Sequence, residues 1–394
     1  MFRAMIISSV VRLKRGREFS VNRFHPWIFS GALESLPTDL VDGCWVEVQD
    51  YKKETIAFGH YQKGSITIRI LSFGKTKPTD DFWRTKLETA LRVRQGAGIV
   101  SETTNCFRLV HGEGDGLPGL VIDYYHGAAI VQAHSAGMQT DRHEITNALR
   151  QLFGSELKAV YFKSAAKETT AEGEYLFGME AVPHIVMEHG NKFLVDWEGG
   201  QKTGFFLDQR ENRKLLGQYS KGRKVLNTFC YTGGFSVYAL AHEAEMVHSV
   251  DASEKAIDLT RKNLELNGFN SNLHACYAED TFDFLKRRET AYDLIILDPP
   301  AFAKHKDARH QAMKGYQRLN AEAMKVIKSG GILFTFSCSQ VVDRQLFYDT
   351  IVSAAIQTGR DIKVLHHLSQ PADHPVSIYH PEGEYLKGLV LYVG

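Results

Sequence analysis

From about residue 220 onward, apolar runs alternate regularly with helix-like segments, and this alternation constrains the fold more than any other feature. KVLNTFCY and YDLIILDPP are typical of the apolar runs, and SEKAIDLTRKNLELNGF is typical of the amphipathic ones. The pattern predicts right-handed βαβ units and a parallel sheet with helices on both faces. Ligands of such sheets bind at the carboxyl ends of the strands, so the residues that follow each strand are the candidates for a site.

The first two predicted strands end in residues suited to a nucleoside ligand. Residues 227–236, N-T-F-C-Y-T-G-G-F-S, contain Gly233 and Gly234, which let the backbone approach a ligand before a helix begins. A plain tight turn is the alternative, and the dinucleotide pattern G-x-G-x-x-G is absent. The second strand ends at Asp251, where a carboxylate accepts hydrogen bonds from ribose hydroxyls. Helix capping together with Ser253 is the alternative for this acid.

The next three predicted strands also end in polar or reactive residues. The third ends in A-E-D, which places Asp280 to accept from an adenine amine or to cap the following helix. The fourth ends in L-D-P-P-A-F (297–302), where the two prolines after Asp298 predict a rigid, extended loop. The fifth ends at Cys338 in F-S-C-S, which is either a small buried residue or a nucleophile.

Glycines, two acids, D-P-P and a cysteine in this order resemble the class I S-adenosylmethionine-dependent methyltransferases. The closest resemblance is to the large-subunit ribosomal RNA methyltransferase I family, which makes 5-methylcytosine. It covers the whole chain and rests on GEGDGLPGLVID (112–123), KTGFFLDQREN (202–212), FCYTGGFSV, LDPPAFAK and FSCS. The resemblance implies S-adenosylmethionine as cofactor, large-subunit ribosomal RNA as partner, and a homodimer.

The expected fold class is α/β, with three domains. Short strands such as TIAFGHY and SITIRILSF, with the resemblance, indicate a PUA-like RNA-binding β-barrel over residues 1–75. A helix at 80–98 and a group of strands predict an α+β middle domain over 76–183. A Rossmann-like class I methyltransferase domain is expected over 184–394.

The family uses the stretch around Asp208 to cover the methionine end of the cofactor, so Gln209 and Arg210 inherit that role. The residues Phe205–Leu207 are predicted to form an apolar strand before it, and a helix start with a solvated charged face is the alternative. The cofactor-binding positions implied by the resemblance are Gln209, Arg210, Phe229, Tyr231, Thr232, Gly233, Asp251, Ala252, Asp280 and Asp298.

Methylation of carbon 5 explains why this family needs a cysteine. Carbon 5 of a pyrimidine becomes nucleophilic only after a thiolate adds to carbon 6, which is covalent catalysis. Cys338 is the predicted nucleophile, and Asp298 is the candidate to steer or accept the carbon-5 proton. Cys230 also follows a strand, but its position in the cofactor loop favours packing. The D-P-P-A-F motif lacks the second cysteine of a related branch.

Basic residues near the N-terminus are the predicted RNA contacts. The net charge of +1 does not by itself indicate a nucleic-acid-binding protein. The sequence VRLKRGREF (11–19), however, contains four cations, and Lys304 follows the D-P-P motif, where it could contact phosphate or base. The four cations, called the basic segment below, are Arg12, Lys14, Arg15 and Arg17.

Composition excludes several classes of protein. Five cysteines without a C-x-x-C pair argue against disulfides and against a zinc site, so no metal is expected. No apolar run approaches the length of a membrane span and no secretory signal is present, so a cytoplasmic protein is expected. Three other functions stay open: a guanine N-methyltransferase acting on ribosomal RNA, a non-catalytic RNA-binding factor, and a nicotinamide oxidoreductase.

Overall fold

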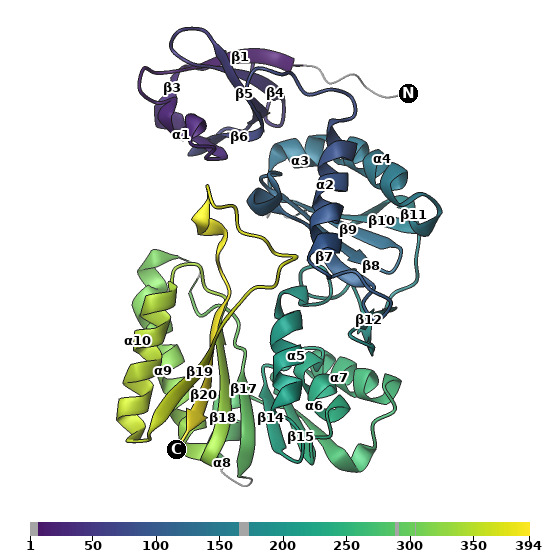
Figure 1. Ribbon diagram of the computed structural model, residues 1–394, viewed down its shortest axis with the longest axis vertical. Helices are drawn as coiled ribbons and strands as arrows, with labels where there is room; N and C mark the ends of the chain where they lie inside the picture. Colours follow the sequence, from purple (N-terminus) through teal and green to yellow (C-terminus); the bar gives the residue numbers. More distant parts are fainter. Residues whose placement is uncertain (1–6, 165–172, 288–290, 304) are drawn as a thin grey trace. The chain divides into compact units, whose positions relative to one another are not determined.

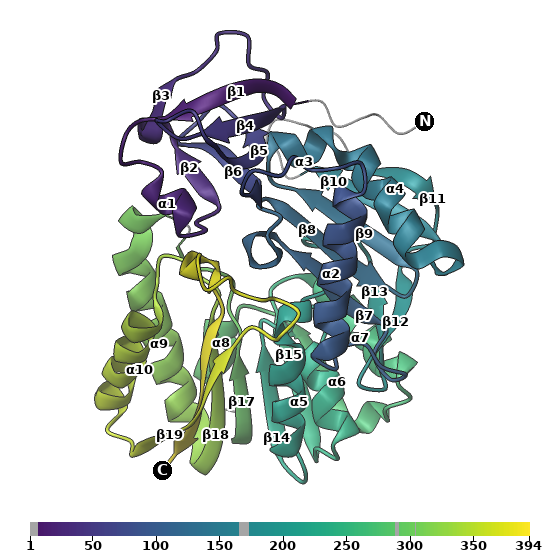
Figure 2. The same ribbon diagram turned by 45° about the horizontal axis from the view of Figure 1, so that its top comes forward.

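A computed structural model describes residues 7–164, 173–287, 291–303 and 305–394 (Figure 1 and Figure 2). The chain divides into two compact units, which are described separately. The N-terminal unit comprises Met1–His184, Asp196–Gly204 and Ala372–Gly383. The C-terminal unit comprises Ile185–Val195, Phe205–Pro371 and Glu384–Gly394.

The N-terminal unit begins with a six-stranded sheet in the order β2-β6-β5-β4-β1-β3. Side chains at the end of β1 alternate between a buried and a more exposed face: Val11 and Leu13 are buried and Arg12 is partly exposed. The predicted short strands are confirmed. The elements are β1 (Ile7–Leu13), α1 (Phe19–Asn22), β2 (Trp27–Phe29), β3 (Leu33–Ser35), β4 (Trp45–Gln49), β5 (Thr55–Tyr61) and β6 (Ile66–Phe73).

A second sheet in this unit has the order β11-β10-β9-β8-β7 and shares a hydrophobic core with the first. Trp45 joins that core, and its Nε1 donates a 2.8 Å hydrogen bond to Asp141. The shared core stabilises the two sheets as one unit. The elements are α2 (Phe82–Gly96), β7 (Cys106–His111), β8 (Leu120–Tyr125), β9 (Ala128–Ala133), α3 (Ala136–Thr140), α4 (Arg142–Phe153), β10 (Ala159–Ser164) and β11 (Glu174–Gly178).

The C-terminal unit is built on a seven-stranded sheet in the order β16-β15-β14-β17-β18-β20-β19. Helices α5, α6 and α7 pack together on one face, and α9 and α10 pack together on the other (Figure 1). The strands are β14 (Lys224–Thr228), β15 (Met246–Asp251), β16 (His274–Ala278), β17 (Tyr292–Leu297), β18 (Ile327–Ser337), β19 (Ile362–Ser369) and β20 (Lys387–Val393). The hairpin β12 (His184–Glu188) and β13 (Asn191–Val195) precedes them, and the helices are α5 (Arg210–Gln218), α6 (Gly234–Ala241), α7 (Glu254–Leu266), α8 (Thr281–Arg287), α9 (Arg309–Val326) and α10 (Arg344–Thr358).

The structure corrects two expectations about this unit. The sheet is not wholly parallel, because β20 runs antiparallel to both β18 and β19. Phe205 and Phe206 do not form a strand; they lie in a loop, and Leu207 begins a short 3-10 turn that leads into α5. Their rings pack on Phe193 at 4.9 Å and on Tyr231 at 5.1 Å, so packing within the unit overrides their strand propensity. Over the described residues, no helix is long and apolar enough to span a membrane.

Candidate active site

The carboxyl ends of β14 to β18 meet at one edge of the C-terminal sheet, as the strand alternation predicts. Side chains lock neighbouring ends together. Thr228, the last residue of β14, donates from Oγ1 to the carbonyl of Ile296 in β17 at 2.7 Å. The five residue groups that follow these strands are therefore held close together on a rigid platform.

The loop after β14 has the strained backbone expected of a ligand cradle. Phe229 and Tyr231 have backbone φ angles of 55° and 47°, which residues other than glycine rarely adopt. Gly233 has a φ of 75°, and a Cβ at this position would lie 2.6 Å from Cγ2 of Thr260. Gly233 therefore packs closely against α7, which both a tight turn and a ligand cradle allow. Thr232 is buried within this loop.

Asp251 fixes the shape of the same loop. Its two carboxylate oxygens accept the backbone N–H groups of Tyr231 at 3.0 Å and Ser253 at 2.9 Å. Ser253, rather than the acid, caps α7, by accepting from the N–H of Ala256 at 3.3 Å. A carboxylate accepts about four hydrogen bonds, so Asp251 retains capacity for ribose hydroxyls. Ala252 is exposed beside it.

Asp280 caps the start of α8, the alternative to an adenine contact. Its Oδ1 accepts the N–H groups of Phe282 at 2.8 Å and Asp283 at 3.2 Å, at the start of α8. The residue is exposed at the end of β16. Capping and an adenine contact are compatible, because they use different lone pairs of one carboxylate.

Gln209 and Arg210 lie at the start of α5 and are both buried, at 3% and 0% exposure. A solvated charged face is therefore wrong for these residues. The Nε of Arg210 lies 3.4 Å from Oε2 of Glu188. Arg213 donates to both oxygens of the same carboxylate, from Nε to Oε1 and from Nη2 to Oε2, at 2.8 Å each. Gln209 accepts from Nδ2 of Asn212 at 2.6 Å. Two arginines around one buried carboxylate make α5 a rigid, positively charged wall of the C-terminal unit.

The two serines of F-S-C-S fix the direction of Cys338. Ser337 donates to the hydroxyl of Tyr316 at 3.0 Å, and Ser339 donates to the carbonyl of Ala303 at 2.7 Å. Both serines are buried, at 0% and 1% exposure, whereas Cys338 is only half-buried. Successive side chains of an extended chain alternate in direction, so the thiol of Cys338 points away from the face to which the two serines are anchored.

Lys387 and Tyr316 complete this end of the sheet, and sequence reasoning missed both. Lys387 is 5% exposed, and its ammonium donates to the carbonyls of Ser339 and Val342 at 2.6 Å each. Burial lowers the pKa of Lys387 to about 8, and the charge of Cys338 acts in the opposite direction. A lysine opening the otherwise apolar run KGLVLYV was the available signal.

Tyr316 lies between the fourth and fifth strand ends. Burial raises its pKa to about 12, with smaller contributions from the charges of Cys338 and Asp298. The phenol is therefore protonated at neutral pH and serves as a fixed dipole. Asp298 itself is partly buried at the end of β17.

The other cysteines are less suited to nucleophilic chemistry. Cys230 is 6% exposed, and burial raises its pKa well above the ordinary value, despite Oγ1 of Thr260 at 3.7 Å. Burial also raises the pKa of Cys44 and Cys276, and Cys106 is fully buried. A thiol with a raised pKa supplies little thiolate at neutral pH.

The basic segment lies on the N-terminal unit, at the end of β1. Arg12 is partly exposed and pairs with Glu34 at 3.6 Å. Lys14, Arg15 and Arg17 are exposed. Lys304 lies outside the described residues.

Comparisons with known proteins agree with this architecture. A family described as S-adenosylmethionine-dependent methyltransferase matches residues 107–382, and a PUA-like domain matches residues 11–73. A protein of Aeromonas hydrophila named Ribosomal RNA large subunit methyltransferase I is 40% identical over 98% of this chain and 99% of its own length. The protein of that name from Shewanella amazonensis is 38% identical over 97% and 99%.

Solved structures share the fold. A structure described as a SAM-dependent methyltransferase from Streptococcus mutans has a TM-score of 0.83 at 23% identity. The match covers 98% of this chain and 100% of that chain. A methyltransferase complexed with SAH has a TM-score of 0.84 at 24% identity, with the same coverages of 98% and 100%. The α/β methyltransferase fold with an N-terminal PUA-like domain is thus confirmed, as is dependence on S-adenosylmethionine.

Proposed function

This chain belongs to the ribosomal RNA large subunit methyltransferase I family, and on that premise we propose that it makes 5-methylcytosine in large-subunit ribosomal RNA. The observation that carries the proposal is the setting of Cys338. Its thiol is half-buried at the carboxyl end of β18, between two anchored serines and close enough to Lys387 for their charges to interact. Transfer to an amino nitrogen needs no such nucleophile.

The loop after β14 and the start of α5 would hold the cofactor. S-adenosylmethionine, when bound, supplies an electrophilic methyl group. The strained loop around Gly233 would let the cofactor approach the protein backbone closely. Asp251 and Asp280 would accept hydrogen bonds from the ribose and the adenine of the cofactor. Gln209 and Arg210 would border its methionine end, and Phe229, Tyr231, Thr232 and Ala252 would line the remainder.

Cys338 acts on the base. The thiolate adds to carbon 6 of cytosine, which forms a carbon–sulfur bond and moves the double-bond electrons toward carbon 5. Carbon 5 is then nucleophilic enough to accept a methyl group. Removal of the carbon-5 proton returns the electron pair to the ring, restores the double bond, and expels the thiolate. The target base must leave its stack to reach the thiol.

Three neighbours would assist that cycle. The Lys387 ammonium would favour the thiolate over the thiol. Asp298 would steer or accept the carbon-5 proton, with Tyr316 as a protonated donor beside it. An Asp298→Asn variant should lose methyl transfer to a greater extent than cofactor affinity, and normal turnover would remove Asp298 from the mechanism.

A covalent trap tests the assignment of Cys338. RNA with 5-fluorocytosine at the target position should form a denaturant-stable complex with the wild type, because fluorine cannot leave as a proton does. Cys338→Ala should form no complex and transfer no methyl group, yet bind S-adenosylmethionine as the wild type does. Cys230→Ala is the matched control, and should still form the complex. Methyl transfer by Cys338→Ala, with methylguanosine in the product digest, would favour the guanine N-methyltransferase instead.

RNA binding, assembly and location are part of the same proposal. The basic segment would bind the RNA backbone from the N-terminal unit, with Lys304 as a further contact. We further propose a homodimer that acts in the cytoplasm. Sedimentation of the purified chain tests the dimer, and RNA affinity without any methyl transfer would instead support a non-catalytic RNA-binding factor.

A further inference from the structure

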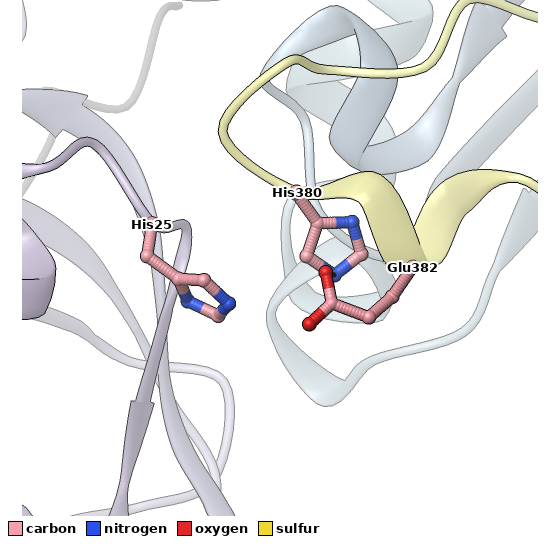
Figure 3. A group of neighbouring side chains, drawn as sticks. All are labelled: His25, His380 and Glu382. Atoms are coloured by element: carbon pink, nitrogen blue, oxygen red, sulfur yellow. Dashed lines mark ion pairs between the residues drawn. The ribbon is translucent and has the colours of Figure 1, made fainter.

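Three side chains of types that can bind a metal ion converge within the N-terminal unit. One ligand atom each from His25, His380 and Glu382 lies within 4.8 Å of the others. His25 precedes β2, and the other two lie on the segment Ala372–Gly383 that joins β19 to β20. Figure 3 shows the His25 ring facing His380 and Glu382. Residues from the two ends of the chain thus present two imidazoles and one carboxylate to a common point.

His380 is a buried ring without a hydrogen-bond partner. It is 3% exposed and packs against Trp27, with ring centroids 4.4 Å apart. Among the described residues, neither ring nitrogen has a hydrogen-bond partner. Buried polar atoms are nearly always paired, because an unpaired one loses its water without compensation. A ligand that accepts the lone pair of His380 would remove that deficit.

His25 has the second interaction that is typical of a metal-bound histidine. Its Nδ1 lies 3.3 Å from the carbonyl oxygen of Trp27 and 3.2 Å from the backbone nitrogen of the same residue. With the proton on Nδ1, the ring donates to the carbonyl. Its Nε2 lone pair is then available for a cation, and such a donor contact fixes the tautomer and orientation of metal-bound imidazoles.

Glu382 supplies a negative charge on an exposed side chain that can move. It is exposed, and its Oε2 lies 3.9 Å from Nε2 of His380. A simple ion pair between these two residues is the alternative. Such an ion pair would not involve His25, and it would leave the second ring nitrogen of His380 without a partner among the described residues. It therefore explains fewer of these contacts than a metal ion does.

We propose that His25, His380 and Glu382 bind one divalent transition-metal ion of the zinc class. Two imidazole nitrogens and one carboxylate oxygen suit such an ion and leave a fourth position for water. At bond lengths of about 2.0 to 2.2 Å, tetrahedral donor atoms lie roughly 3.4 Å apart, so modest side-chain movement closes the site. The bound ion would tie the segment Ala372–Gly383 to the six-stranded sheet. The site is independent of methyl transfer.

Metal titration of the full-length protein tests this proposal. After chelator treatment and dialysis, calorimetry with zinc should show one high-affinity equivalent, and zinc should raise the melting temperature. His25→Gln and Glu382→Gln should each weaken binding at least tenfold. Both positions lie outside the buried core, which keeps the test valid if His380→Gln fails to fold. His143→Gln, an exposed histidine on α4, is the matched control and should bind as the wild type does.

Cobalt substitution separates this site from the free cysteines. Cobalt bound by nitrogen and oxygen should give tetrahedral ligand-field bands without thiolate charge-transfer absorption. Strong charge-transfer absorption would place the ion on cysteine and overturn the proposal. Absence of a one-equivalent zinc site in the wild type would overturn it too, as would equal affinity in His25→Gln, Glu382→Gln and the control.

Discussion

Replacing Lys387 by methionine should weaken the nucleophile without affecting the cofactor site. The change removes a buried ammonium whose two hydrogen bonds hold the carbonyls of Ser339 and Val342, in the loop after Cys338. Methionine keeps an unbranched apolar side chain of similar length. The variant therefore changes the charge next to the thiol more than it changes the packing of the sheet.

The size of the effect follows from the separation of the two charges. The ammonium lies 2.6 Å from the carbonyl oxygen of Ser339, the residue after Cys338, and the charge of Cys338 acts on it. At an effective dielectric constant of about 20, unit charges interact by about 4 kcal/mol at 4 Å and about 2 kcal/mol at 8 Å. Because the thiol is partly exposed, we expect about 1 to 2 kcal/mol, which is roughly a 5- to 30-fold loss of thiolate.

Alkylation of Cys338 measures the thiolate directly. The rate of modification by iodoacetamide, followed peptide by peptide by mass spectrometry, should fall 5- to 30-fold near neutral pH, as estimated above, and recover at higher pH. Methyl transfer should fall in parallel, with unchanged affinity for S-adenosylmethionine. Lys363→Met, at an exposed lysine on β19, is the control and should behave as the wild type does. Superimposable rate–pH curves for Lys387→Met and wild type would refute the reasoning.

The same variant has a separate signature in stability. Because burial lowers the pKa of Lys387 to about 8, the unfolded chain binds more protons than the folded chain between that pH and the unfolded value of 10.5. The wild type should therefore gain stability as pH rises through this window, by up to about 3 kcal/mol for this group. Urea unfolding should show that gain in the wild type and a smaller one in Lys387→Met.

Three further predictions concern the scaffold and RNA binding. Glu188→Gln removes the carboxylate shared by two buried arginines and should lower the free energy of unfolding by about 3 to 5 kcal/mol in urea titrations, whereas the exposed Glu243→Gln should change it by less than about 1 kcal/mol. Gly233→Ala should weaken S-adenosylmethionine binding at least tenfold in calorimetry, whereas Gly222→Ala, with a positive φ but no close neighbour, should not. Neutralising the basic segment should reduce the slope of log affinity against log salt by about 3, and an unchanged slope would exclude it from the RNA contact.

Much of the C-terminal sheet could be predicted because its strands are buried on both faces. Leu294, Ile295, Ile296 and Leu297 of β17 are all fully buried, so the strand reads as one continuous apolar run. The order of the site residues followed from the same feature, since carboxyl ends of parallel strands share an edge. The position of Asp298 at that edge could therefore be predicted without knowing any contact between distant parts of the chain.

The missed features depend on pairing between distant parts of the chain. Lys387 reaches Cys338 because β20 runs antiparallel to β18, with Ser337 opposite Lys387. Nothing local in the sequence fixes that register. Phe205 and Phe206 belong to an apolar run that predicts a strand, but their rings pack on residues elsewhere in the unit.

The two cysteines at strand ends show what separates a nucleophile from a packing residue. Cys338 directly follows β18, and Cys230 lies two residues after the end of β14. Position along the chain therefore does not distinguish the two cysteines. Cys230 faces α7, where burial raises its pKa and a hydroxyl is its nearest polar neighbour. Cys338 has buried, hydrogen-bonded serines on both sides, is itself only half-buried, and lies close enough to Lys387 for their charges to interact. A shift of one residue at the end of β18 would give Cys338 the buried position of a neighbouring serine. The proposed chemistry therefore depends on strand register as much as on the cysteine itself.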